Sequence, residues 1–229
     1  MKYEIIIFDA DDTLFDFKKA EKEAFKNTML EFNIEYNEDY HLREYSNINT
    51  AIWKEFEKGL ITQEKLKVER FKRFSEKLKI EFDEIEFVNS YTKNLSFASF
   101  LYDDSIELIE NLHNDYRLTI ITNGLTEVQH KRVRNSVIGK YFEEVVISEE
   151  IGAAKPDIKI FEYTLNKISY TDKRKVLMVG DSLSSDIKGG INFGIDTCWF
   201  NPEKAENKSG LNPTYEISKL TLLKNILAQ

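Results

Sequence analysis

The feature that most constrains this chain is an acidic turn that directly follows a short apolar run. Residues 3–8, Tyr-Glu-Ile-Ile-Ile-Phe, predict a buried β-strand, and Asp9-Ala10-Asp11-Asp12-Thr13 comes next. In open α/β folds, ligands bind at the carboxyl ends of parallel strands, so this turn predicts a binding site. Crowded carboxylates repel one another. A divalent metal ion would offset that repulsion and leave one carboxylate free for chemistry.

Composition excludes several classes of protein. The 229 residues suffice for one domain with a large insertion or for two small domains, and 41% hydrophobic with 31% charged residues is typical of a globular chain. A net charge of −8 without a long basic run argues against a nucleic-acid partner. No apolar run approaches the roughly 18 residues of a membrane span, and the N-terminus lacks a secretory signal. The single cysteine, Cys198, fits a reducing compartment, so we expect a cytoplasmic protein that binds neither nucleic acid nor membrane.

The first hundred residues predict helices. Apolar residues recur at three- and four-residue spacing in four segments between residues 16 and 95. Gly59 is placed to end the second helix, Thr62 to cap the third, and Asp83 with Glu86 to form a capping box for the fourth. The four helices predict a small bundle inserted after the first strand, where it can cover the carboxyl end of that strand.

After residue 98 the pattern changes to short β-branched runs that alternate with helices. This alternation predicts an α/β fold with a three-layer, Rossmann-like parallel sheet and right-handed crossovers. We assign residues 1–15 and 98–229 to the sheet domain and residues 16–97 to a helical cap. The expected strands are 3–8, 118–122, 144–148, 175–179, 195–200 and 215–217, and the expected helices are 104–116, 126–137, 157–168, 184–193 and a last one, capped by Ser218, that ends at residue 227.

Three further polar clusters stand where predicted strands end or helices begin. Thr122-Asn123-Gly124 is a common turn sequence, and it would also present a hydroxyl and backbone N–H groups to an anion. A lysine such as Lys155, before Pro156, is ordinarily solvated, but a cation there could neutralise a phosphate or a nucleophilic carboxylate. In Gly180-Asp181-Ser182-Leu183-Ser184-Ser185-Asp186, one acid could merely cap a helix, yet two such carboxylates suit Mg²⁺.

The conjunction of the four clusters favours a functional site. In chain order they supply paired aspartates, a threonine with exposed amides, a lysine and a second pair of aspartates. A parallel sheet brings the carboxyl ends of its strands to one crevice. If each cluster had only a structural role, four unrelated structural features would have to occur together at the same edge of the sheet.

This ordered set resembles the motifs of the haloacid dehalogenase-like hydrolase superfamily, most of whose members are Mg²⁺-dependent phosphatases. The segment from Asp9 to Thr13 is similar to the first motif, Thr122 to the second and Lys155 to the third, and the segment from Gly180 to Asp186 is similar to the fourth. The resemblance covers the sheet domain, and the helical insertion has the family's first cap position. Asp12 departs from the glycine that many of these phosphatases have.

A closer resemblance is to the YjjG-type bacterial pyrimidine 5′-nucleotidases, in which the position of Asp12 is commonly acidic as well. It is carried by Asp-Ala-Asp-Asp-Thr-Leu-Phe, Ile-Thr-Asn-Gly, Val-Ile-Ser-Glu-Glu-Ile-Gly-Ala-Ala-Lys-Pro-Asp and Gly-Gly-Ile-Asn-Phe-Gly-Ile-Asp-Thr-Cys-Trp-Phe-Asn. This resemblance implies a 5′-nucleotidase for pyrimidine (deoxy)nucleoside monophosphates. It also implies that the cap supplies most of the substrate selectivity.

The resemblance implies a mechanism through an aspartyl-phosphate. Asp9 would attack phosphorus, and Asp11 would protonate the leaving oxygen and then activate water. Mg²⁺ would be held by Asp9, the backbone carbonyl of Asp11 and Asp181, with Asp186 as a ligand or as an acceptor for metal-bound water. The phosphate oxygens would be held by Thr122, the Asn123 amide and Lys155.

Other functions use similar residues. The four clusters would serve any small phosphate ester, so a sugar-phosphate or phosphoglycolate phosphatase, or a phosphomutase, remains open. A metal-dependent phospho-acceptor domain is disfavoured, because it is much shorter and has no helical insertion. A metal-free haloacid dehalogenase would need neither Asp11 nor the second aspartate pair. In the cap, Trp53 and Phe56 could stack a nucleobase, but their spacing favours the core of the bundle.

Overall fold

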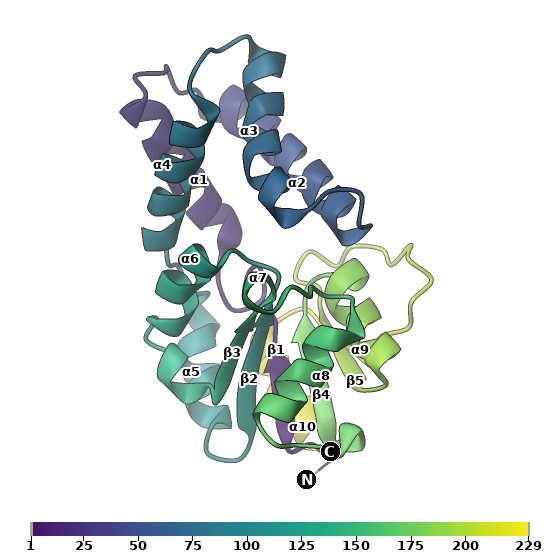
Figure 1. Cartoon of the computed structure of the whole chain (residues 1–229). Helices are drawn as coiled ribbons and strands as arrows, with labels where there is room; N and C mark the ends of the chain where they lie inside the picture. Colours follow the sequence, from purple (N-terminus) through teal and green to yellow (C-terminus); the bar gives the residue numbers. More distant parts are fainter. Residues whose placement is uncertain (1, 229) are drawn as a thin grey trace. The chain divides into compact units, whose positions relative to one another are not determined.

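The computed structural model of the chain describes residues 2–228, which form two compact units. The sheet unit comprises the described residues up to Phe17 together with those from Phe100 onward, and the helical unit is Lys18–Ser99. Figure 1 labels the α-helices of both units and the strands β1 to β5. Each junction between the units lies two residues later than the sequence analysis places it.

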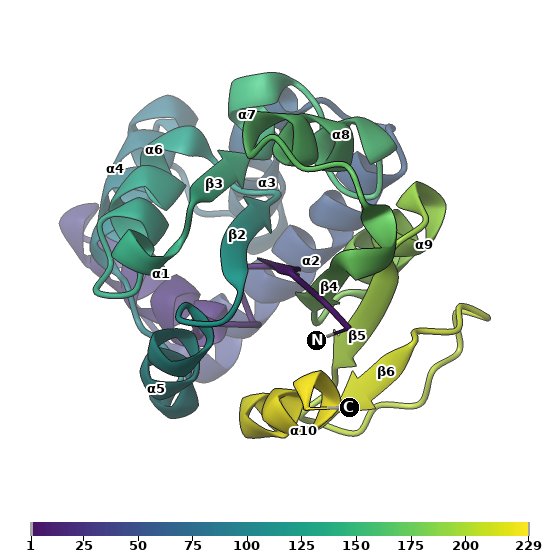
Figure 2. The same ribbon diagram turned by 90° about the horizontal axis from the view of Figure 1, so that it is seen from below.

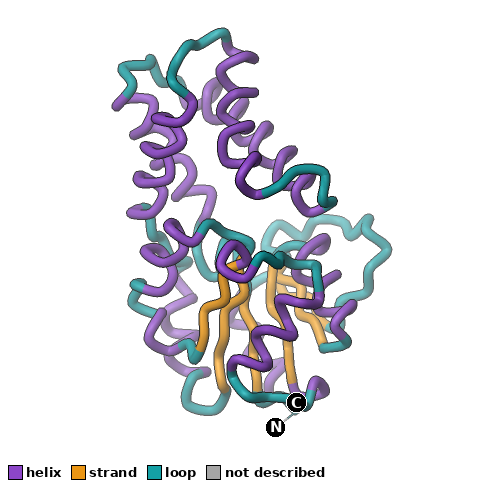
Figure 3. The backbone as a smooth tube through the Cα atoms, viewed as in Figure 1, coloured by secondary structure: helices purple, strands orange, loops and turns teal. Residues whose placement is uncertain are grey.

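Within residues 2–228, the sheet unit is built on a parallel sheet of six strands, drawn in orange in Figure 3. Their order across the sheet is β3-β2-β1-β4-β5-β6, and each neighbouring pair is parallel. The strands are β1 (Ile5–Phe8), β2 (Arg117–Thr122), β3 (Glu144–Ile147), β4 (Val176–Gly180), β5 (Asp196–Phe200) and β6 (Tyr215–Ile217). The expected α/β class is confirmed, including the short edge strand near the C-terminus.

The helices of the sheet unit are short. They are α5 (Asp103–Leu112), α6 (Thr126–Gln129), α7 (Ser148–Ile151), α8 (Ile158–Lys167), α9 (Lys188–Phe193) and α10 (Leu223–Leu227), with π-helical turns η2 (His130–Arg134) and η5 (Leu183–Ile187) and 3₁₀ turns η3 (Gly139–Tyr141), η4 (Lys173–Lys175) and η6 (Leu220–Leu222). Within residues 2–228, no helix combines the length and the apolar character that crossing a bilayer requires.

Several helix predictions differ from the structure in detail. The single helix predicted over residues 126–137 is α6 followed by the wider turn η2, and it ends at Arg134. The helix predicted over 104–116 ends at Leu112, because the chain turns there to enter β2. The sequence analysis gives no helix at α7. The prediction that Ser218 caps the last helix is wrong, since the N-cap position of η6 is Lys219 and the chain at Ser218 is still leaving β6.

The sheet has helices on both faces. Alternate residues of β1 point to opposite faces, as they do in any strand. Ile6 and Phe8 belong to a buried cluster with α5 and α10, and Ile5 and Ile7 to another with α8 and α9. Figure 2 shows these helix pairs on opposite sides of the strands. The unit therefore has the three layers predicted, and burial on both faces explains the unbroken apolar run of β1.

The strand register places three strand ends level with one another. Phe8, the last residue of β1, pairs with Ile120 of β2 and with Val179 of β4. The Asp9 cluster begins directly after Phe8, the Thr122 cluster two residues beyond Ile120, and the fourth cluster directly after Val179. Three of the four predicted clusters thus meet at one edge of the sheet.

The helical unit is a bundle of α1 (Phe17–Glu31), α2 (Arg43–Glu57), α3 (Gln63–Leu78) and α4 (Glu84–Phe97), with the π-helical turn η1 (Glu38–Leu42). Two predicted caps are confirmed. Thr62 caps α3 by accepting a bond from the backbone N–H of Lys65. Asp83 caps α4 by accepting a bond from the backbone N–H of Glu86.

Aromatic side chains form the core of the helical unit. Tyr45 stacks on Phe25 and on Phe71, with ring centroids 4.4 and 5.3 Å apart. Trp53 and Phe56 lie outside this core: they are half-buried and contact each other edge to face at 5.6 Å. Assigning these two rings to the core is therefore wrong. The buried face of α2 is the one that carries Tyr45, Asn49 and Ile52.

Candidate active site

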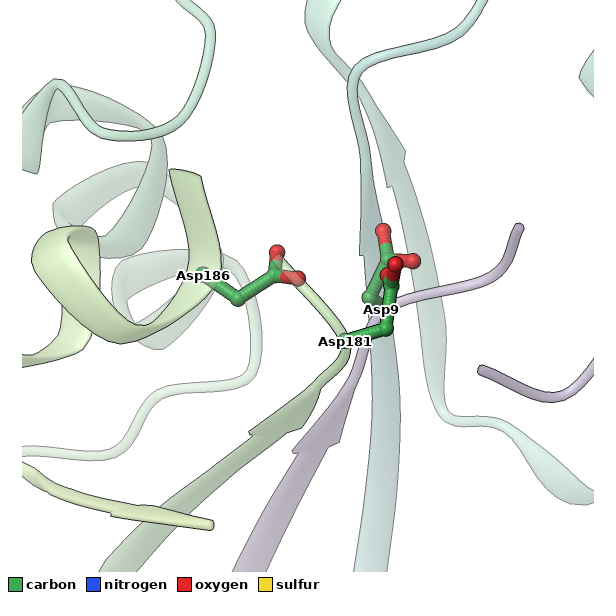
Figure 4. A group of neighbouring side chains, drawn as sticks. All are labelled: Asp9, Asp181 and Asp186. Atoms are coloured by element: carbon green, nitrogen blue, oxygen red, sulfur yellow. The ribbon is translucent and has the colours of Figure 1, made fainter. Parts of the chain in front are cut away.

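Three carboxylates converge at the carboxyl edge of the sheet. Asp9 follows β1, Asp181 follows β4, and Asp186 lies slightly further on, in η5. One carboxylate oxygen of each lies within 4.8 Å of the others. Figure 4 shows the side chains of Asp9 and Asp181 next to each other, with Asp186 reaching toward them from the helical turn. We call these three residues the carboxylate triad. They are three of the four residues expected to hold a metal ion.

The triad is an unfavourable arrangement of charge unless a cation is present. Asp9 and Asp186 are buried, and Asp181 is half-buried. Burial raises the pKa of Asp9; the Lys155 ammonium opposes this rise, and the charge of Asp186 adds to it. Burial also raises the pKa of Asp181, and the charges of Asp186 and Asp9 raise it further. Clustered carboxylate oxygens are ligands that suit Mg²⁺, so the donor set fits that ion.

The Lys155 ammonium is buried among these carboxylates. Its side chain is 1% exposed, lies 2.7 Å from Asp186 Oδ1, and also pairs with Asp9. It donates a further hydrogen bond of 2.7 Å to the backbone carbonyl of Ile121. Burial alone would lower the pKa of Lys155, but Asp186 and Asp9 raise it above its ordinary value. Lys155 is therefore a permanent positive charge in contact with the predicted nucleophile.

Backbone groups and a glycine fix the position of Asp186. The backbone N–H of Ser182 donates to Asp186 Oδ2 at 3.0 Å. A β-carbon at Gly180 would lie 2.3 Å from the same oxygen, so only glycine leaves room for this carboxylate. The predicted Gly180–Asp186 motif thus requires glycine at its first position for steric reasons.

Two side chains hold the backbone of Asp181. The Thr13 hydroxyl accepts a bond of 3.1 Å from the backbone N–H of Asp181. The indole Nε1–H of Trp199 donates to the Asp181 carbonyl at 2.8 Å. Thr13 therefore links the first motif to the fourth. The sequence analysis does not identify Trp199, because it lies in an ordinary apolar strand.

The Asn123 side chain binds protein backbone. Its Nδ2 donates to the Lys155 carbonyl and its Oδ1 accepts from the Lys155 N–H, each at 2.8 Å. Asn123 thus fixes the segment that carries Lys155 at the edge of the sheet. The expected contact of the Asn123 amide with phosphate stays a prediction. Thr122 is buried, with its hydroxyl 2.8 Å from Gln129 Nε2.

The Asp11 side chain is not part of the triad and has its own partners. Its Oδ1 accepts a bond of 2.8 Å from Arg132 Nη1, and its Oδ2 accepts one of 2.7 Å from Gln129 Nε2. Neither partner is among the site residues predicted from the sequence. Their three-residue spacing on a predicted helix places them on one face, but nothing in the sequence shows what that face meets.

Comparison with known proteins identifies the family. The family model for haloacid dehalogenase-like hydrolases matches residues 6–200. The pyrimidine 5′-nucleotidase YjjG of Escherichia coli is 34% identical over 100% of both chains. The pyrimidine 5′-nucleotidase PynA of Streptococcus pneumoniae is 36% identical over 95% of this chain and 92% of its own. The crystal structure of YfnB from Bacillus subtilis bound to magnesium is similar with a TM-score of 0.94 and 35% identity over 100% of each chain. The chain therefore belongs to the haloacid dehalogenase-like hydrolases.

Proposed function

We propose that this chain is a Mg²⁺-dependent phosphomonoesterase that forms an aspartyl-phosphate on Asp9. The observation that carries the proposal is the contact of Asp9 with a buried ammonium group inside the carboxylate triad. A carboxylate and a phosphate dianion repel each other, so the attack needs cations close to both. Lys155 supplies one positive charge, and Mg²⁺ supplies further positive charge when it is bound.

The metal ion would be held by residues of the first and fourth motifs. Asp9 and Asp181 would be ligands through their carboxylates, and Asp11 through its backbone carbonyl. Asp186 would be either a ligand or an acceptor for metal-bound water. The support for this assignment is the spacing of the triad oxygens and their chemical type.

Each remaining step is assigned to a residue of this chain. Asp9 attacks phosphorus in line, and the bond from phosphorus to the leaving oxygen breaks. Asp11, which holds a proton at the start of the cycle, gives it to that oxygen and later takes one from the water that hydrolyses the aspartyl-phosphate, so the cycle restores the Asp9 carboxylate and the protonated Asp11. The phosphate oxygens are held by Thr122, the Asn123 amide and Lys155.

We further propose that pyrimidine (deoxy)nucleoside monophosphates are the substrates, with the helical unit acting as a selective cap. Support comes from two relatives named as pyrimidine 5′-nucleotidases, each matched over 92% or more of its own length. The residues assigned in the sheet unit act on the phosphoryl group and on the leaving oxygen, which every phosphate monoester has, so they would serve any small phosphate ester. Selectivity must then arise elsewhere, and the half-buried rings of Trp53 and Phe56 are available for stacking.

The test is phosphate release from a panel of esters, measured with and without Mg²⁺. The panel contains UMP, dUMP, dTMP, AMP, GMP, several sugar phosphates and phosphoglycolate. We expect kcat/KM to favour the pyrimidine nucleotides by about tenfold or more, and EDTA to abolish release until Mg²⁺ is restored. A preference for a sugar phosphate would overturn the proposed substrate class but would leave the proposed phosphomonoesterase mechanism in place. No release from any ester would overturn both and favour a phospho-acceptor protein.

A further inference from the structure

Arg132 is an unusual residue to find beside Asp11, because its side chain is fully buried. Its guanidinium group is 0% exposed, whereas the Asp11 side chain is 25% exposed. The guanidinium also lies over the rings of Phe15 and Phe17, with centroids 5.9 and 5.5 Å away. A buried arginine is costly for a fold unless its charge is matched. Asp11 supplies an opposite charge, with its Oδ1 2.8 Å from Arg132 Nη1.

Gln129 connects the same carboxylate to the predicted phosphate site. Its Nε2 donates to Asp11 Oδ2 at 2.7 Å and lies 2.8 Å from the Thr122 hydroxyl. Its Oε1 accepts a longer bond of 3.4 Å from Arg132 Nη1. A β-carbon at Gly124 would lie 2.4 Å from Gln129 Cγ, so the glycine after Asn123 leaves the space in which Gln129 crosses to Asp11.

The backbone brings these two side chains to one place. Gln129 is the last residue of α6, and Arg132 lies in the π-helical turn η2 that follows. A π-helical turn changes the direction in which a helix presents its side chains, and such turns are frequent at functional sites. Here the turn directs Arg132 inward, whereas Arg134 of the same turn pairs with Glu150 at 2.7 Å.

We propose that Arg132 and Gln129 are positioning residues that hold the Asp11 side chain for proton transfer to the leaving group, and that Arg132 pairs with the carboxylate that this transfer leaves on Asp11. The proposal rests on the function proposed above. Both oxygens of Asp11 accept a hydrogen bond, so its side chain is restricted to one orientation. Gln129 also contacts Thr122, which is predicted to bind the phosphate. These contacts would therefore fix the distance between the proton donor and the phosphoryl group.

The chemistry of the leaving group gives this role a signature. A nucleoside leaves as an alkoxide and needs a proton as the bond from phosphorus to oxygen breaks. A 4-nitrophenolate is stable as an anion and leaves without one. Losing the orientation of Asp11 should therefore slow the first step with a nucleotide much more than the first step with 4-nitrophenyl phosphate.

The experiment compares Arg132→Met, Gln129→Leu and the wild type on UMP and on 4-nitrophenyl phosphate. We expect kcat for UMP to fall about 10- to 100-fold in Arg132→Met, with KM changed less than threefold. The rate constant for the burst of 4-nitrophenolate in the first turnover should fall less than threefold. Arg132→Lys, which keeps the charge, should recover part of the loss. Arg134→Met is the matched control from the same turn and should retain wild-type rates on both esters.

A double-mutant cycle separates positioning from a merely structural role. Asp11→Ala removes the group that Arg132 holds, so adding Arg132→Met to it should change kcat for UMP less than twofold.

Three results would overturn the inference. In the first, Arg132→Met retains wild-type kcat on UMP. In the second, the losses on UMP and in the 4-nitrophenolate burst are equal. In the third, the effect of Arg132→Met is undiminished in the Asp11→Ala background. None of these three results contradicts the proposed function, because the wild-type protein still hydrolyses UMP in each case. A wild type that releases phosphate from no ester overturns the proposed function and the inference with it.

Discussion

The ammonium group of Lys155 lies 2.7 Å from Asp186 Oδ1, and both side chains are only 1% exposed. The same ammonium pairs with Asp9, so one buried cation joins the predicted nucleophile to the last acid of the fourth motif. One positive charge cannot neutralise three carboxylates. A further cation would favour the ionised form of all three.

Replacing Lys155 with methionine should destabilise the sheet unit more without Mg²⁺ than with it. The substitution leaves Asp9 and Asp186 buried without their partner, and losing one member of a buried pair typically costs about 3–5 kcal/mol. The proposed Mg²⁺ ion would bind only the folded site and should restore part of that loss. Turnover should fall about 100-fold or more, because the charge proposed to stabilise the transition state is gone. Urea unfolding in EDTA and in Mg²⁺ measures the first effect.

The control for that experiment is Lys159→Met, an exposed lysine at the start of α8. Its free energy of unfolding should change by less than about 0.5 kcal/mol in either condition. A Lys155→Met protein as stable in EDTA as the wild type would contradict the view that this ammonium stabilises the triad.

Replacing Asp9 with asparagine should abolish turnover and preserve the fold. The amide cannot attack phosphorus, so we expect kcat to fall at least about 10³-fold. Asp186 still pairs with Lys155 in the variant, so the buried ammonium keeps a partner. Phosphate release and the far-ultraviolet circular dichroism spectrum measure the two effects. An Asp9→Asn protein that retained most of its activity would rule out Asp9 as the nucleophile.

Replacing Arg70 with methionine should weaken the helical unit in a pH-dependent way. Arg70 of α3 is buried and donates to Asn49 Oδ1 at 3.3 Å, and Asn49 Nδ2 donates to Glu21 Oε1 of α1 at 2.7 Å. Burial raises the pKa of Glu21, while bonds from Ser46 and Asn49 and the charge of Arg70 lower it. A carboxyl group whose pKa is higher in the folded state than in the unfolded state favours unfolding when it ionises. The fold therefore becomes less stable as the pH rises above the unfolded-state pKa, which is about 4.3 for glutamate.

Without Arg70 the pKa of Glu21 should rise further, so the loss of stability should be larger at pH 8 than at pH 5. We expect about 3–5 kcal/mol at pH 8. Urea unfolding followed by Trp53 fluorescence, in a Trp199→Phe background, reports on the helical unit alone. Arg73→Met, on the same helix but paired at the surface with Glu55, should cost under about 1 kcal/mol. Equal losses at both pH values would show that Arg70 does not act on Glu21.

The sequence predicts the sheet and its acidic edge because both depend on local patterns. Unbroken apolar runs identify strands buried on both faces, and the polar residues that follow them identify the strand ends. Asp9, Asp181 and Asp186 could be grouped in advance, since parallel strands end at one edge.

The contacts that the sequence does not predict join residues far apart in the chain. Arg132 reaches Asp11 only because α6 continues into a π-helical turn, and helical spacing does not predict such a turn. Trp199 has the sequence context of any core strand, although its indole N–H bonds to the Asp181 carbonyl. Trp53 and Phe56 have the spacing of core residues, but the buried stripe of α2 passes beside them. In each case tertiary packing determines what the side chain contacts, and the local sequence pattern does not predict it.

The place of β1 in the sheet has a consequence for how the protein is made. Ile5 pairs with Arg117 on one side and with Val176 on the other, and both partners are synthesised long after it. Contacts between segments so distant in the chain form late, because a long loop must close first. A nascent chain that has not yet produced β4 holds β1 with one edge unpaired and has no fourth motif. Catalytic competence therefore arrives only after β4 and the residues that follow it have been synthesised.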